Sequence, residues 1–206
     1  MMDMASNTHS KDAMTRPLFE PMNEKHERPD EWSGPLGFVI GGFARPSMQA
    51  ERDGALAEQY FAAAEALIDS ILDRRVADYQ VANAALFLYR HSFELLLKSG
   101  LPPKARAEKD IHDLGKLARS YAHHKRQADE TVPPWIIKRC DELAAIDPGS
   151  EAFRYGEYGT PKAKDGKPIT DEIHVDLLHL KAAMAALNAA LVERNWLIRM
   201  ARGDRP

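Results

Sequence analysis

Apolar residues recur at three- and four-residue steps along most of the chain after position 53, which is the spacing of amphipathic helices. This repeat predicts a helix over 53–75. The next segment, 77–99, is apolar on nearly every face and is followed by Gly100 and Pro102, residues that end helices. We expect 77–99 to be the central helix, because an apolar surface on all sides needs neighbours on all sides.

Three more helices are predicted towards the C-terminus. The first begins near 110–113 and ends at 127. The second runs from 133–134 to 146, and the third from 171 to 201. The intervening 147–171 reads as a long loop, and no segment is rich in strand formers. The pattern therefore predicts an all-α fold, an antiparallel bundle of about five helices.

Residues 1–50 differ from the rest, because prolines and glycines recur there at a density that forbids a long helix. We predict an extended N-terminal arm over 1–50 and one helical domain over 51–206. The apolar run 38–40 could dock the arm on the bundle or on a neighbouring subunit, and a disordered arm is the open alternative.

Composition narrows the class of protein. The 206 residues are 44% hydrophobic, and the net charge of −3 argues against indiscriminate nucleic-acid binding, although Lys and Arg are in excess over 98–126. No segment is apolar enough for a membrane span, and no secretion signal is visible. The single Cys140 fits a reducing compartment and a small core filler. We therefore expect a cytoplasmic protein that does not contact a membrane.

The most informative segment is a polar stripe on the predicted central helix. At 100° per residue, one arc of about 100° on a mainly apolar helix holds Asn83, Phe87, Arg90, His91, Glu94 and Lys98. Buried charges need partners, and Glu94 is four residues from both Arg90 and Lys98. Two interpretations remain open: an internal ion-pair network, or a groove that binds a ligand or performs catalysis.

Two further segments carry candidate residues. His112 and Asp113 stand near a predicted helix start, where a cap is the simplest role. Arg154 lies beside Tyr155 in the loop, a setting in which a guanidinium can grip a phosphate while aromatic rings stack on a ligand. The alternative is a structural pair of Arg154 with Asp147 or Glu151.

The order of these segments resembles the HEPN-like helical-bundle proteins of prokaryotes. The resemblance rests on the run Tyr-Arg-His-Ser-Phe-Glu-Leu-Leu-Leu-Lys over 89–98, on His-Asp-Leu over 112–114 and on 147–155, and covers about 53–200. It implies a small all-α bundle, often dimeric, from toxin–antitoxin, anti-phage or other RNA-processing systems. Catalytic members of that family cut RNA without a metal, with an Arg, usually a polar residue, and a His four to six positions on.

This chain departs from that catalytic pattern. Arg194 is followed by Asn195 but by no His, whereas Arg119 and His124 match the spacing at a helix end that we expect to be solvated. If RNA is cleaved, the reaction needs a base, an acid and positive charge beside the phosphate, and Arg90, His91 and Arg154 could together meet these needs if the loop folds over 77–99.

An enzyme of another class is the rival interpretation. His112 and Asp113 are similar to the His-Asp segment of HD-domain phosphohydrolases, in which His91 and either Asp147 or Asp171 would complete a metal site.

The function that we expect is therefore that of a HEPN-like protein which binds RNA, a nucleotide or another phosphate-bearing ligand, with catalysis undecided and no cofactor or metal. A homodimer is expected, with a partner protein reached through the arm. A non-enzymatic dimerisation or interaction module is the alternative. The candidate catalytic residues are Arg90 and His91, and the candidate ligand-binding residues are Glu94, Lys98, His112, Arg154 and Tyr155.

Overall fold

The computed structural model describes residues 49–106, 112–156, 158–160, 166, 168 and 173–201, with side chains from 52 to 195. Within these ranges the structure is helical and contains no β-strand, so the all-α prediction is confirmed. The helices are α2 (Gln49–Leu72), α3 (Asp78–Ser99), α4 (Pro103–Arg106), α5 (Leu114–Gln127), α6 (Pro134–Ile146), α7 (Ala152–Tyr155) and α8 (Leu177–Ala201). The predicted arm lies outside the described residues as far as position 48.

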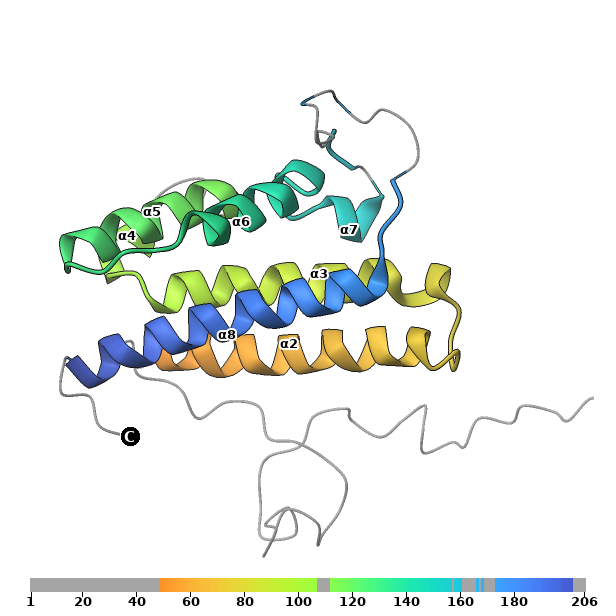
Figure 1. Cartoon of the computed structure of the whole chain (residues 1–206), viewed down its shortest axis with the longest axis horizontal. Helices are drawn as coiled ribbons and strands as arrows, with labels where there is room; N and C mark the ends of the chain where they lie inside the picture. Colours follow the sequence, from red (N-terminus) through yellow and green to blue (C-terminus); the bar gives the residue numbers. More distant parts are fainter. Residues whose placement is uncertain are drawn as a thin grey trace, which may run out of the picture. The chain divides into compact units, whose positions relative to one another are not determined.

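Helix α3 is the centre of the fold, as the sequence predicted. It packs against α2, α5, α7 and α8 (Figure 1). A short turn after α2 returns the chain antiparallel to it as α3, and α8 lies against both helices. Helices α5 and α6 form a second pair, which reaches α3 through α5. The central helix can therefore place its polar residues against several other segments.

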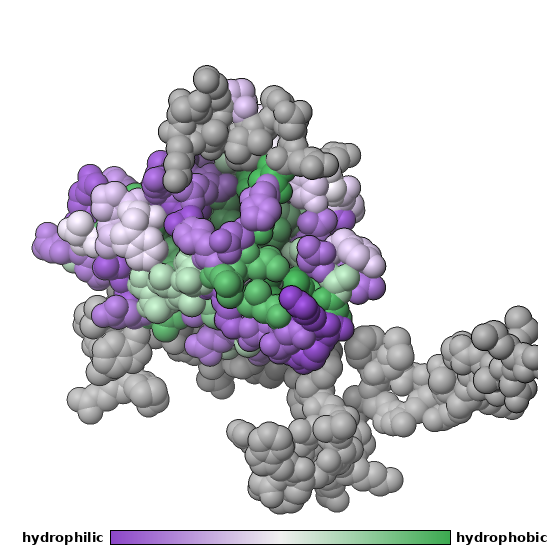
Figure 2. All heavy atoms as spheres, turned by 45° about the vertical axis from the view of Figure 1, so that its right-hand side comes forward, coloured by the Kyte–Doolittle hydropathy of each residue, from purple (hydrophilic) through white to green (hydrophobic). Residues whose placement is uncertain are grey.

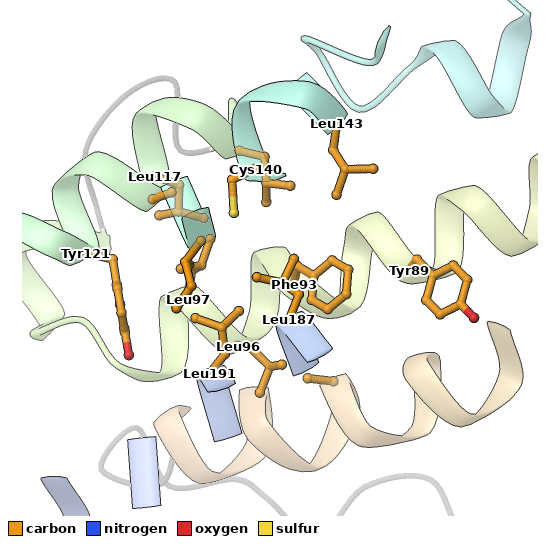
Figure 3. Packing of buried hydrophobic residues seen from close by; sticks show 14 of the residues in the cluster. Tyr89, Phe93, Leu96, Leu97, Leu117, Tyr121, Cys140, Leu143, Leu187 and Leu191 are labelled. Atoms are coloured by element: carbon orange, nitrogen blue, oxygen red, sulfur yellow. The ribbon is translucent and has the colours of Figure 1, made fainter. Parts of the chain in front are cut away.

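The core gathers apolar side chains from every long helix. Phe93 and Leu97 of α3, Leu117 of α5, Cys140 of α6 and Leu187 of α8 point towards one another (Figure 3). Leu97 and Phe93 have no exposed surface, and burying a side chain of this size contributes about 1.5–3 kcal/mol. Burial raises the pKa of Cys140 to about 12, so its thiol remains protonated and acts as a core filler.

Side-chain caps fix the starts of α5 and α8. The Asp113 carboxylate accepts a hydrogen bond from the Lys116 N–H at 2.9 Å and starts α5, so the predicted cap is Asp113 and not His112. Asp176 accepts from the His179 N–H at 3.0 Å, and α8 begins beside it at Leu177 and not at 171.

Other boundaries also differ from the sequence-based ranges. Helix α2 begins at Gln49, four residues before the predicted start, and ends at Leu72 rather than 75. It ends there because Arg74 adopts the left-handed conformation, with φ of 57°, which does not continue an α-helix. The one-turn helices α4 and α7 were not predicted, because a single turn carries too few residues for a hydrophobic period.

Candidate functional site

The polar stripe of α3 lies where segments that are far apart in the sequence meet the central helix. Four residues from other segments contact this stripe. They are Tyr60 of α2, His112 before α5, Asp147 after α6 and Arg154 of α7, the last of them through Phe87. The three segments that carried the sequence-based hypotheses therefore converge on one face of α3.

Arg90 is completely buried and held by three partners. Its Nη1 lies 2.9 Å from Glu94 Oε2, its Nε lies 3.0 Å from Asp147 Oδ2, and its Nη2 donates to the backbone oxygen of His112. Its side chain has no exposed surface. Arg90 thus ties α3 to the segments before α5 and after α6, and a ligand at the surface does not reach it.

Around Glu94, which is 2% exposed, lies a group of polar residues that we call the cluster. Its members are Arg90, His91, Glu94, Lys98, His112 and Asp147. Glu94 accepts from Arg90, from Lys98 Nζ at 2.5 Å and from His112 Nδ1 at 2.9 Å. Burial by itself would raise the pKa of Glu94, but the hydrogen bond from Lys98 and the nearby positive charges lower it below its usual 4.5. Glu94 is therefore a carboxylate at neutral pH, which confirms the sequence prediction of a buried, paired carboxylate.

Asp147 links the cluster to α7. Its Oδ1 accepts backbone N–H groups from Glu151 at 2.7 Å and from Ala152 at 2.9 Å, and so caps the turn that begins α7. Its Oδ2 lies 3.0 Å from Arg90 Nε but out of line for a hydrogen bond, and that nitrogen donates instead to the Asp147 backbone oxygen. The attraction between the two charges is strong because both side chains are buried, where water screens charges little.

His91 is half-buried between two aromatic rings. Phe87 stacks parallel to it with 5.7 Å between centroids, and Tyr60 meets it edge-on at 4.7 Å. Among the described residues no hydrogen bond reaches either ring nitrogen. Burial, together with the charges of Lys98 and Arg90, lowers the pKa of His91 below 6.5 despite the opposing charge of Glu94. The imidazole is thus neutral at pH 7 and has a nitrogen lone pair that no described residue uses.

Arg154 and Tyr155 lie on the outside of this cluster. The Arg154 guanidinium stands over the rings of Phe87 at 5.8 Å and Tyr155 at 5.3 Å, while its Nε donates to the Ser150 backbone oxygen. The alternative pairing of Arg154 with Asp147 or Glu151 is wrong. No described residue forms an ion pair or hydrogen bond with the terminal nitrogens of Arg154, so both can bind an anion, and Tyr155 is 70% exposed.

The exposed groups in the cluster and on its outer side are therefore cationic, imidazole or aromatic. The two carboxylates, Glu94 and Asp147, are buried and balance the charges of Arg90 and Lys98. Arg154 adds positive charge at the surface, and the His112 side chain is 65% exposed. A surface of this kind favours anionic ligands with aromatic or heterocyclic parts.

The residues that match the family's catalytic spacing do not join this cluster. Arg119 pairs with Asp141 at 2.6 Å on the surface, and His124 lies near its own helix's Ser120 backbone oxygen at 2.9 Å. Asn195 is buried and bonds to the Tyr121 hydroxyl at 2.9 Å, a structural link between α8 and α5.

The HD-type metal site is not formed by the described residues, within which no three His, Cys, Asp or Glu side chains gather closely enough to hold a metal. Asp113 caps α5 and Asp147 caps α7, so both carboxylates have structural tasks. Asp171 lies outside the described residues. No helix in the described ranges is long and apolar enough to cross a membrane.

The sequence placed Phe87 on the same arc as His91, and the structure stacks the two rings. It did not predict Tyr60 as a ring contact of His91, because the rotation of α2 about its axis is set by packing. Comparison of the chain with protein-family models, with curated proteins and with solved structures gives no match.

Proposed function

We propose that this chain is a HEPN-like protein that binds single-stranded RNA on the open face of α3. The observation that carries the proposal is the position of the Arg154 guanidinium over the rings of Phe87 and Tyr155, with Phe87 in turn stacked on His91. A guanidinium whose terminal nitrogens are accessible binds phosphate oxygens with two hydrogen bonds. The exposed ring of Tyr155 beside it can stack on a base, and only unpaired bases can present their faces in this way.

The binding is tested by fluorescence anisotropy with a labelled single-stranded RNA of 20 nucleotides and mixed sequence. Loss of a stacking ring costs about 1–3 kcal/mol, so Tyr155→Ala should weaken binding roughly 5- to 150-fold. Arg154→Ala should weaken it and also flatten the dependence on salt by about 0.7 in the log–log slope. Tyr79→Ala is the matched control, because Tyr79 is a tyrosine of the same helix that is 84% exposed and lies two helical turns before Phe87. Equal losses in Tyr79→Ala and Tyr155→Ala, or no binding by the wild type, would contradict the proposal.

A non-enzymatic interaction module remains the second candidate, and a specific observation favours it. Tyr79 and Leu178 are large apolar side chains that are 84% and 70% exposed. Hydrophobic side chains gather on the face that Figure 2 brings forward. Light scattering of the wild type and of Leu178→Ser would detect a dimer that depends on this residue. A dimer that dissociates in Leu178→Ser, together with absent RNA binding, would favour the interaction module.

The HEPN resemblance adds a biological setting to the proposal. A role in a toxin–antitoxin or other defence system follows from the resemblance alone, and its test is independent of the site. Expression of the wild type should slow growth of a bacterial host if the chain is an RNA-directed toxin, and Arg154→Ala expressed at the same level should not.

A further inference from the structure

Helix α5 has an apolar face and a basic face. Its buried side includes Leu114, Leu117 and Tyr121, which pack in the core. On the opposite side, exposed basic side chains recur at three- and four-residue steps: Lys116, Arg119, His123 and Arg126. No Asp or Glu lies within Leu114–Gln127. These basic side chains extend for about 15 Å along the helix axis, and we call them the basic row.

Helix α6 lies beside α5 and runs antiparallel to it, because the chain turns back within the short connection 128–133 (Figure 1). Arg119 sets the register of the two helices, since its Nη1 lies 2.6 Å from Asp141 Oδ1. The helices are close there, because a Cβ at Gly115 would lie 2.4 Å from the same oxygen. Residues near the start of α6 therefore lie beside the second half of α5, which carries His123 and Arg126.

Trp135, in the first turn of α6, exposes an aromatic ring on this pair of helices. Its side is defined by Ile136 and Cys140, which are buried and face the core. Trp135 is 43% exposed, and Lys138, one helical turn later, is exposed as well. The outer side of the α5 and α6 pair thus combines a row of basic groups with a large ring, and neither belongs to the cluster.

Two carboxylates contact the basic row without covering it. Asp141 pairs with Arg119, whose side chain is 55% exposed, and Asp113 lies 3.9 Å from Lys116 Nζ, on a side chain that is 59% exposed. Ion pairs at such exposed positions are weak. A phosphate group can therefore compete with either carboxylate.

The basic row begins where the cluster ends. His112 belongs to the cluster through its 2.9 Å contact with Glu94, and the next residue, Asp113, caps α5. Lys116 follows His112 by four residues and is the first member of the row. A ligand that extends past the exposed ring of His112 therefore meets Lys116 next.

We propose that the basic row and Trp135 form a second binding region for single-stranded RNA, which holds the strand beyond the face of α3. The inference rests on the proposed function and extends the ligand from the nucleotides at Arg154 and Tyr155 to a longer strand. Proteins that hold single strands combine cations along the backbone with rings on which bases stack. Helix α5 supplies the cations, and Trp135 supplies the ring. An acidic protein segment would match the cations, whereas base stacking also accounts for the exposed ring.

The test is fluorescence anisotropy of the full-length chain with the labelled RNA of 20 nucleotides over a range of salt concentrations. Trp135→Ala should weaken binding roughly 5- to 150-fold. Lys116→Ala and Arg126→Ala should each flatten the log–log salt dependence by about 0.7. Arg75→Ala is the matched control, because it removes a 63% exposed arginine from the turn after α2 and should leave the slope unchanged.

Asp141→Asn should have the opposite effect and strengthen binding by up to about fivefold, because it removes the carboxylate that competes with phosphate for Arg119. Glu58→Gln removes the same charge from the exposed side of α2 and should not strengthen binding. Weaker binding by Asp141→Asn, at unchanged thermal stability, would contradict the placement of RNA on α5.

The outcomes separate this inference from the proposed function. Photocrosslinking with single 5-iodouridines along the strand should reach Tyr155 from one end and Trp135 from the other. Losses in Tyr155→Ala but in none of the α5 and α6 variants would overturn this inference and leave the proposed function standing. Losses confined to the α5 and α6 variants would overturn the proposed site on α3, and absent binding would overturn both. Displacement of the RNA by polyglutamate at equal charge concentration would overturn this inference in favour of an acidic protein partner.

Discussion

Glu94→Ala should destabilise the protein by about 3 kcal/mol, because the substitution leaves buried positive charge with fewer partners. Glu94 is 2% exposed and accepts from Arg90, Lys98 and His112. Removing one partner of a buried ion pair costs roughly 3–5 kcal/mol. The lower end applies here because Arg90 keeps Asp147, at 3.0 Å, and because Lys98 can turn its ammonium to solvent.

The assay is urea unfolding followed by circular dichroism, with thermal melts as a second readout. A loss of about 3 kcal/mol corresponds to a fall in Tm of roughly 6–12 °C for a domain of this size. Glu142→Ala is the matched control, since Glu142 forms an ion pair with Arg139 at 2.5 Å but is 46% exposed. Exposed pairs contribute at most about 1 kcal/mol. If Glu94→Ala costs no more than Glu142→Ala, the cluster is not a buried network and the reasoning fails.

The pH dependence gives the same prediction a second check. Because the pKa of Glu94 is lower in the folded chain than its usual 4.5, the carboxylate stabilises the fold above pH 4.5. That contribution is lost as the pH falls through the folded-state pKa. The difference in stability between wild type and Glu94→Gln should therefore be largest at neutral pH and shrink in acid. A difference that grows below pH 4.5 would mean that Glu94 is protonated in the native state.

Two substitutions outside the cluster test the fold. Gly100→Ala should cost about 1–3 kcal/mol in urea unfolding, because a Cβ there would lie 2.5 Å from Asn195 Oδ1 and from Tyr121 Cε2; unchanged stability would show that α8 is not so close to the end of α3. Arg74→Gly should raise the unfolding free energy by roughly 0.5–1 kcal/mol, because Arg74 has φ of 57° and a glycine adopts this conformation without steric cost; a loss of stability would show that the turn after α2 has another conformation.

The long helices could be predicted from the sequence because their evidence is local and repeated. Helix α3 is bounded by Ala77 and Gly100, and α6 by Pro133 and Asp147, within a residue of the predicted ends. The start of α8 could not be predicted as well. Apolar periodicity continues weakly before Leu177, and the choice of start depends on a cap by Asp176 that competes with other polar residues nearby.

The candidate site could be predicted in its parts but not in its assembly. Four-residue spacing was enough to pair Glu94 with Arg90 and Lys98, because both partners lie on the same helix. The partners from other segments, His112 and Asp147, depend on how α5 and α7 pack against α3, which no local pattern records. Spacing also could not reveal that Arg90 is buried, since a polar arc on a helix is equally compatible with a groove and with an internal network.

Stability and ligand binding are coupled in this cluster, because the interactions that stabilise the fold also orient the exposed ring of His112. Arg90 binds the His112 backbone and Glu94 binds its ring, so a substitution at either position should loosen the segment before α5 as well as destabilise the core. Glu94→Gln separates the two effects. Glutamine has almost the same size as glutamate and can still accept from Lys98, but it lacks the negative charge that the ring of His112 faces. If the cluster is only structural, this variant should change stability alone. If His112 also contributes to RNA binding, the affinity of Glu94→Gln for RNA should fall by more than its folded fraction falls.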